Sequence, residues 1–262
     1  MCLKTINTSS CVFALKQLSV NELISGSMDG SIQIYDLSSL APKRTLLAHT
    51  GWVTAIELLR NGDLVSCSTD ETIKVWSLDS GKCMRTLSGH KYFVNCVQVL
   101  PNGLLASGSA DKSIKVWSLE SGKCVNTLMG HSHFVSCLQI LPNGLLASGS
   151  ADKTIKLWNY DTGRCTNTLL GHNGCVRDLR LTARGELISC SNDKVIKMWD
   201  FKSGVCVRSL EGHTDKVICL QILSNDKLIS GSGSNSIKIW DLKSGKCFRT
   251  LSGILNSDDV GY

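Results

Sequence analysis

The side chains with the clearest potential for chemistry are a histidine, a serine and an aspartate that return together at a fixed interval. His90, Ser107 and Asp111 form one such set, and equivalent sets recur every 41 residues. These residue types are the ingredients of a nucleophilic triad. Four equivalent sets cannot each be an active site, and no Gly-rich phosphate loop, H-E-x-x-H motif or nucleophile elbow accompanies them. The repetition favours hydrogen bonding of buried polar groups and predicts that the protein is not an enzyme.

Cysteine is the second residue type that could carry chemistry, since the chain contains thirteen. The count is odd, no C-x-x-C motif occurs, and one position is repeated as Cys83, Cys124, Cys165, Cys206 and Cys247. A free cysteine packs as a small hydrophobic group, so we expect structural thiols and neither metal nor cofactor. This cysteine usage indicates a reducing compartment, and we expect a cytoplasmic protein.

The unit that must position these side chains is 41 residues long. Its histidine stands at His49, His90, His131, His172 and His213, and its tryptophan at Trp76, Trp117, Trp158, Trp199 and Trp240. In one copy, residues 94–100 are rich in β-branched and apolar types and end at a Pro-Asn-Gly turn. Short strands are also expected over 104–109, 113–117 and 124–128. Four short antiparallel strands per ~40–45 residues are the signature of a propeller blade.

The chain resembles the WD-repeat β-propeller family over nearly its whole length. The family's dipeptide falls at Tyr35-Asp36, Trp76-Ser77, Trp117-Ser118, Trp158-Asn159, Trp199-Asp200 and Trp240-Asp241, although the regular spacing is the stronger evidence. The resemblance implies an all-β propeller of six four-stranded blades, or most of a seven-bladed ring. We expect a surplus outer strand over residues 1–7, the propeller over 8–251 and a polar C-terminal tail over 252–262.

The resemblance also implies a buried hydrogen-bonded tetrad in each blade. In the family, a His before the first strand, a Ser in the second, an Asp in the next turn and the Trp of the third are linked. By position the complete sets are His49, Ser66, Asp70 and Trp76; His90, Ser107, Asp111 and Trp117; His131, Ser148, Asp152 and Trp158; and His172, Ser189, Asp193 and Trp199. The end copies depart from the pattern, with Thr8 for His and Tyr35 for Trp in the first and Ser234 for Asp in the last.

Positions that vary between copies are expected to face partners, and in the WD-repeat family three positions per blade line the top rim where partners dock. Three neighbouring blades carry an aromatic residue there, and aromatic residues and Arg dominate binding hot spots. The expected partner-binding residues are Trp52, Phe93, Phe134, Arg177, Lys216, Phe13, Met28 and Asn192. The alternative interpretation is that these rings pack between blades and cover the core.

Composition narrows the classes of partner. No run approaches the ~20 apolar residues of a membrane span, and the first twenty residues lack the features of a signal peptide. The net charge of +6 is spread by lysines repeated with the unit, whereas nucleic-acid binding needs a clustered basic face. We therefore expect a protein or peptide partner, with no membrane, nucleic acid or small-molecule substrate.

These observations favour a non-catalytic scaffold or adaptor that binds a mainly apolar segment on the top face, with an acidic or phosphorylated group meeting Arg177. Two alternatives stay open. The chain could be the sensor portion of a larger multidomain protein such as a STAND-type ATPase, or the substrate-recognition propeller of a ubiquitin ligase. Against the latter, the chain has no W-D-x-R motif, since Trp199-Asp200 and Trp240-Asp241 are each followed two residues on by Lys.

Overall fold

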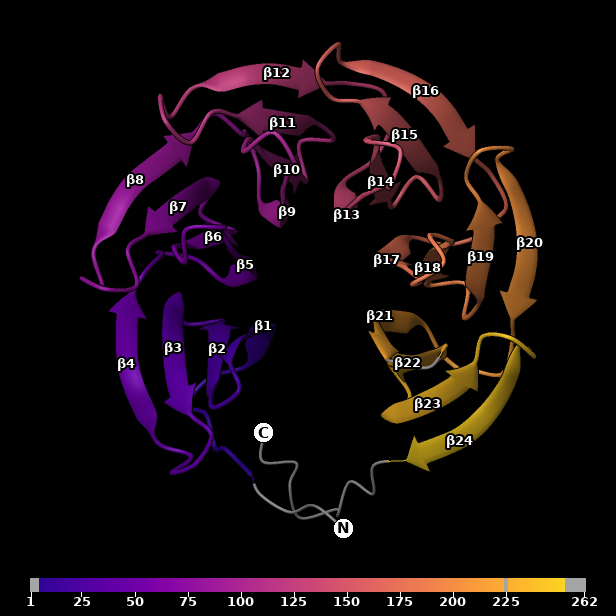
Figure 1. Cartoon of the computed structure of the whole chain (residues 1–262), viewed down its shortest axis with the longest axis horizontal. Helices are drawn as coiled ribbons and strands as arrows, with labels where there is room; N and C mark the ends of the chain where they lie inside the picture. Colours follow the sequence, from indigo (N-terminus) through magenta and orange to yellow (C-terminus); the bar gives the residue numbers. More distant parts are fainter. Residues whose placement is uncertain (1–4, 224–225, 253–262) are drawn as a thin grey trace.

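The computed structural model of the chain describes residues 5–223 and 226–252. The regular secondary structure of these residues consists of β-strands alone, and the twenty-four strands form six four-stranded antiparallel sheets. Figure 1 shows the sheets as blades around a central opening. The predicted all-β propeller of six four-stranded blades is confirmed. None of the described residues forms a helix with the length and apolarity that a membrane span requires.

Each blade consists of four consecutive strands, of which the first lies nearest the centre and the fourth outermost (Figure 1). Blade 1 contains β1 (Val12–Ser19), β2 (Glu22–Ser27), β3 (Ser31–Asp36) and β4 (Pro42–Leu47). Blade 2 contains β5 (Val53–Leu58), β6 (Leu64–Ser68), β7 (Thr72–Trp76) and β8 (Cys83–Ser88). Blade 3 contains β9 (Val94–Val99), β10 (Leu105–Ser109), β11 (Ile114–Trp117) and β12 (Cys124–Leu128).

The other three blades repeat this order. Blade 4 contains β13 (Val135–Ile140), β14 (Leu146–Ser150), β15 (Ile155–Asn159) and β16 (Arg164–Leu169). Blade 5 contains β17 (Val176–Leu181), β18 (Leu187–Ser191), β19 (Ile196–Asp200) and β20 (Val205–Leu210). Blade 6 contains β21 (Val217–Leu223), β22 (Lys227–Ser232), β23 (Ser236–Asp241) and β24 (Lys246–Ser252).

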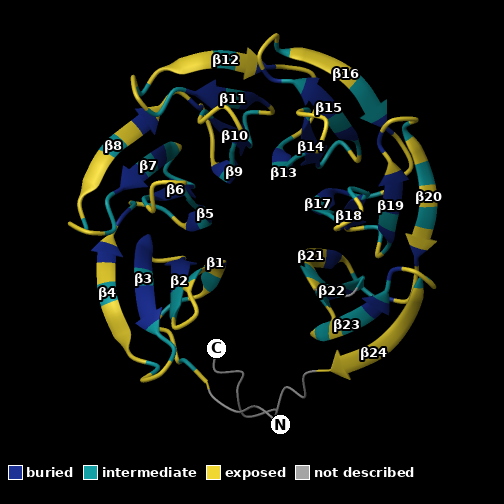
Figure 2. Cartoon of the chain, viewed as in Figure 1, coloured by how far each residue is buried: buried dark blue, intermediate teal, exposed yellow. Residues whose placement is uncertain are grey.

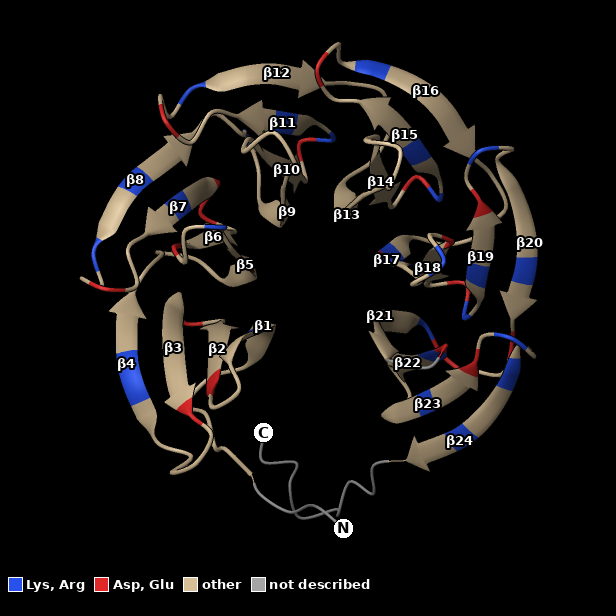
Figure 3. Cartoon of the chain, viewed as in Figure 1, with Lys and Arg blue, Asp and Glu red and all other residues tan. Residues whose placement is uncertain are grey.

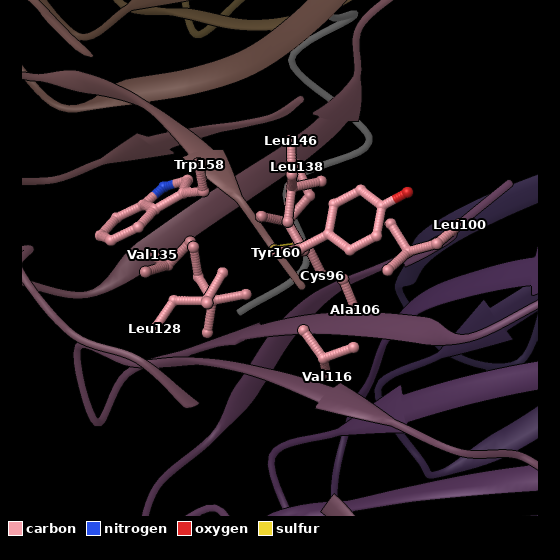
Figure 4. Close-up of a cluster of buried hydrophobic side chains, with 11 residues drawn as sticks. Cys96, Leu100, Ala106, Val116, Leu128, Val135, Leu138, Leu146, Trp158 and Tyr160 are labelled. Atoms are coloured by element: carbon pink, nitrogen blue, oxygen red, sulfur yellow. The ribbon is translucent and has the colours of Figure 1, made fainter. Parts of the chain in front are cut away.

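The hydrophobic core lies between neighbouring blades. Between blades 3 and 4, aliphatic residues such as Ile114 and Leu128 pack against Leu138 and Trp158, and Figure 4 shows this cluster. The blades approach closely enough to require glycine, since a Cβ on Gly108 would lie 2.5 Å from a methyl group of the next blade. Five equivalent clusters, one per pair of consecutive blades, hold the described part of the ring together.

Burial is greatest in the second and third strands of a blade and least in the outer strand (Figure 2). The second strand of blade 3, β10, is buried throughout, whereas the outer β12 is mostly exposed. This gradient corrects the expectation that the repeated cysteines pack in the core. Cys83, Cys124, Cys165 and Cys247 are exposed because they lie on the outer strands, although Cys96 on β9 is buried as expected. The twelve cysteines of the described residues are free, and no cluster there could hold a metal ion.

The two ends of the chain lie largely outside the described residues. Residues 5–8 form no strand, and residues 1–4 are not described, so the surplus outer strand over 1–7 stays a prediction. At the other end Ser252 still belongs to β24, and the rest of the predicted polar tail, residues 253–262, is not described.

Candidate functional site

The recurring polar side chains form one continuous hydrogen-bonded chain within a blade. In blade 3, the indole Nε1 of Trp117 donates to Ser107 Oγ over 2.8 Å, and His90 Nε2 lies 2.7 Å from the same oxygen. The other ring nitrogen, Nδ1, lies 2.8 Å from Asp111 Oδ2. The tryptophan can only donate, so a consistent arrangement has the serine hydroxyl donating to Nε2 and Nδ1–H donating to the carboxylate.

The same arrangement recurs in blades 2, 4 and 5. It joins His49 to Ser66, Asp70 and Trp76; His131 to Ser148, Asp152 and Trp158; and His172 to Ser189, Asp193 and Trp199, at distances of 2.7 to 2.9 Å. The structure thus brings together all sixteen residues that the family resemblance assigned to tetrads.

The tetrad positions loops and is closed to a substrate. Ser107 is fully buried, so its hydroxyl cannot reach a substrate carbonyl. Asp111 Oδ2 also accepts the backbone N–H of Lys91, and Oδ1 accepts the backbone N–H and the hydroxyl of Ser113. These bonds tie the loop before the first strand to the turn between the second and third strands. We call the edge of the ring that these two loops of each blade form the top rim.

Hydrogen bonding keeps the tetrad carboxylates ionised. Burial alone would raise the pKa of Asp193, but hydrogen bonds from His172 and from the backbone N–H of Asn173 outweigh burial and lower this pKa to about 2. The pKa of Asp111 is lowered as well, because hydrogen bonds from His90 and Ser113 outweigh burial.

Blade 6 lacks the aspartate, and this changes the hydrogen bonding and the pKa of its histidine. His213 Nε2 still lies 2.6 Å from Ser230 Oγ, but Nδ1 faces the hydroxyl of Ser236 at 3.4 Å. Burial, together with the positive charge of Lys238, lowers the pKa of His213 to about 4. This histidine is neutral at pH 7.

Restoring the aspartate by Ser234→Asp should raise the free energy of unfolding at pH 7 by about 1 to 2 kcal/mol, because His213 Nδ1 gains a charged acceptor. The pH dependence should change too. The folded-state pKa of His213, near 4, lies below the ordinary value of about 6.5. The contribution of neutral His213 to the free energy of unfolding is therefore complete above pH 6.5 and falls toward pH 4. The added carboxylate raises this pKa and flattens that fall.

Chemical denaturation at pH 7.0 and pH 4.5 checks this prediction. Ser234→Asn is the matched control, since it has the same shape and no charge. Equal stability of the two variants at pH 7.0 would show that the missing carboxylate does not limit blade 6.

The top rim carries an arc of aromatic side chains. Trp52, Phe93 and Phe134 precede the first strands of blades 2, 3 and 4, and their carbonyl oxygens accept N–H bonds from the neighbouring turns. The exposed fractions are 43% for Trp52 and 51% for Phe93, and Phe134 is half-buried. The rings of Trp52 and Phe93 therefore do not pack away between blades.

A stacked pair extends the arc to blade 1. The rings of Phe13 and Trp52 lie parallel, with centroids 5.2 Å apart and an interplanar angle of 8°. Phe13 is 51% exposed, and it comes from a different repeat position than Trp52. Met28, in the turn after β2, is also exposed.

Polar residues at the repeat position of Phe13 serve the scaffold in the middle blades. The side chains of Thr54, Asn95 and Ser136 donate to backbone oxygens of the following blade. At the same position in blade 5, Arg177 is half-buried and lines the central opening together with Phe13. Lys216 is exposed on the rim of blade 6, and so is Asn192 on that of blade 5.

Sequence reasoning missed two exposed rings beside the arc. Tyr92 is 60% exposed, and His133 meets Phe134 edge-on with centroids 4.8 Å apart. Each directly precedes a rim aromatic, so the adjacency in sequence was an available signal.

The charges of the described residues are distributed around the ring, and Figure 3 shows Lys and Arg on many third and outer strands. The lysines of the third strands bond locally, as Lys115 Nζ does to Thr127 Oγ1 at 3.1 Å. No single basic face dominates this view.

Comparison with known families identifies the repeat. A family model described as WD domain, G-beta repeat, matches residues 1–36, 40–77, 81–118, 122–159, 163–200 and 204–241. A search for relatives among curated proteins found no match.

Proposed function

Because the chain belongs to the WD-repeat family, whose propellers commonly mediate protein–protein interactions, we propose that it is a non-catalytic adaptor that binds a partner's peptide segment across its top rim. The observation that carries the proposal is the aromatic arc formed by the exposed rings of Phe13, Trp52 and Phe93 and the half-buried ring of Phe134. Contiguous exposed apolar surface on a soluble domain marks partner sites.

The side chains of the rim indicate which side chains the partner's peptide segment should carry. The stacked rings of Phe13 and Trp52 offer a flat apolar surface, and Phe93 continues it onto the next blade. Arg177 lines the central opening from blade 5, and Lys216 adds a second cation on blade 6. An extended segment that places apolar side chains on the arc and one acidic or phosphorylated group at Arg177 satisfies both features.

Selection from a displayed peptide library on the immobilised protein tests the proposal. We expect enrichment of sequences that combine two or more large apolar residues with an acidic residue. Failure to enrich any such sequence over an uncoated surface would contradict it.

The selected peptides also test the role of Arg177. Arg177→Ala should weaken their binding about tenfold, or roughly 1.4 kcal/mol, and remove the preference for the acidic residue. Lys216→Ala should have a smaller effect, because a rim charge exposed to solvent is screened. Titration by fluorescence anisotropy at two salt concentrations measures both. Equal effects of the two variants would count against a specific site at Arg177.

A further inference from the structure

Five interfaces between consecutive blades can be compared with one another. Consecutive inner strands lie side by side from β1 to β21, but no comparable contact joins β21 to β1 in the described part of the chain. Figure 1 shows the ring open at this place, where Leu15 of blade 1 is 62% exposed and Ile237 of blade 6 is 44% exposed. The five packed interfaces run from blades 1 and 2 to blades 5 and 6.

One repeat position distinguishes these interfaces. It lies two residues after the position of Trp76, in the turn between the third and fourth strands, and its side chain packs on the preceding blade. From blade 2 to blade 6 the residues at this position are Leu78, Leu119, Tyr160, Phe201 and Leu242. Two of the five interfaces therefore contain an aromatic ring where the others contain leucine.

The aromatic rings complete the packing at the bottom edge, which is the edge of the ring opposite the top rim. Tyr160 is 7% exposed and belongs to the same cluster as Leu100, which is 1% exposed. Figure 4 shows the tyrosine ring beside this leucine. Phe201 packs in the same way in the cluster that contains Leu141, and both residues are buried.

Between blades 1 and 2 the ring is missing and a pocket is present. The pocket has a volume of about 490 Å³, and its apolar floor consists of Leu18, Ile34 and Leu78. Leu18 is the equivalent of Leu100, yet both Leu18 and Leu78 are only half-buried. The floor thus lacks the cover that Tyr160 gives to the equivalent residues of blade 3.

The same pocket recurs at another interface that has leucine at this position. Between blades 5 and 6 a pocket of about 330 Å³ is lined by Leu242, Met198 and Arg208. These residues are the repeat equivalents of Leu78, Ile34 and Arg44, and all three of those line the pocket between blades 1 and 2. The pocket between blades 1 and 2 is the larger of the two.

Polar groups surround the mouth of this larger pocket. Lys43 Nζ pairs with Glu22 Oε1 at 2.6 Å, and both residues line the pocket. At the interface closed by Tyr160, Leu104 and Val125 occupy these two repeat positions. An occupant should therefore combine an apolar ring for the floor with hydrogen-bonding groups for the mouth, as an aromatic residue within a polypeptide does.

We propose that the pocket between blades 1 and 2 is a docking site for an aromatic side chain of a partner polypeptide. The ring covers Leu18 and Leu78 as Tyr160 covers the equivalent floor, and the partner's backbone meets Glu22 and Lys43 at the mouth. Burial of the apolar floor provides the driving force. The site lies on the bottom edge, so it is independent of the segment proposed to bind the top rim.

Nuclear magnetic resonance of the methyl-labelled protein tests the proposal. The probe is the blocked pentapeptide Gly-Gly-Tyr-Gly-Gly, and its matched control has leucine in place of tyrosine. We expect saturable shifts at the methyl groups of Leu18, Ile34 and Leu78. The leucine peptide should bind about fivefold more weakly, because it buries less apolar surface. p-Cresol, the tyrosine side chain alone, identifies a pocket that admits only small molecules.

A variant that fills the pocket from within provides a second readout. Leu78→Tyr places a ring where blade 4 has Tyr160, so it should weaken binding of the tyrosine peptide about tenfold or more. It should also raise the melting temperature by about 2 °C, because the ring covers the floor. Leu47→Tyr is the matched control, since this leucine is 91% exposed, does not line the pocket and should leave binding unchanged.

The shifts of the unmodified protein decide the outcome even if Leu78→Tyr folds poorly. Shifts confined to methyl groups outside the floor, or equal affinity for the tyrosine and leucine peptides, would overturn the proposal. Binding of p-cresol without binding of the tyrosine peptide would assign the pocket to a small aromatic molecule. Full binding by a folded Leu78→Tyr variant would place the site elsewhere.

Discussion

Replacing Ser107 by alanine is expected to lower the free energy of unfolding by about 2 to 4 kcal/mol, because each buried polar group left unpaired costs about 1–3 kcal/mol. Ser107 Oγ is the central atom of the hydrogen-bonded chain in blade 3, where it bonds both Trp117 Nε1 and His90 Nε2. The substitution removes both bonds while leaving a methyl group in a fully buried site. Chemical denaturation followed by tryptophan fluorescence measures the loss.

The chain contains its own control for this experiment. Ser25 stands at the same repeat position in blade 1 and is 1% exposed, yet its hydroxyl has no hydrogen-bond partner in the described residues. Ser25→Ala should therefore change stability by less than about 0.5 kcal/mol, or raise it slightly. Equal losses at Ser25 and Ser107 would show that packing of the second strand, and not the tetrad, sets the cost.

The blade could be predicted from the sequence because the residues that mark each repeat bond one another in the structure. Trp117 and His90 recur at a constant spacing, and both bond Ser107. The opening of the ring could not be predicted in this way. Leu15 and Ile237 occupy the same repeat positions as residues that are buried in the other blades, and only the arrangement of all six blades decides whether a neighbour covers them.

The rim could be predicted only in part. Variation between repeats pointed to Trp52 and Phe93, which are exposed. The stacking of Phe13 on Trp52 joins different repeat positions on different blades, so comparison of equivalent positions does not reveal it. Asn95 occupies a variable rim position, but its amide bonds the next blade. Variation alone therefore does not separate partner contacts from contacts between blades.

Truncating the aromatic arc is the second change with a large expected effect. The triple variant Trp52→Ala, Phe93→Ala, Phe134→Ala should weaken binding of the selected peptides at least a hundredfold, because a central aromatic hot spot contributes about 2–4 kcal/mol. Trp52 and Phe93 are about half exposed, so their loss should leave the melting temperature nearly unchanged.

The matched control removes as many exposed apolar side chains from the outer strands. Met84, Val125 and Phe248 lie on β8, β12 and β24 and are 52%, 53% and 71% exposed. Their combined replacement by alanine should leave peptide binding unchanged.

The dissociation constant of one selected peptide, measured on the unmodified protein and on both triple variants, tests the proposed binding rim most directly. The proposal predicts loss of binding in the rim variant alone, with all three proteins melting together. Normal binding by the rim variant, or equal loss in the outer-strand control, would contradict it.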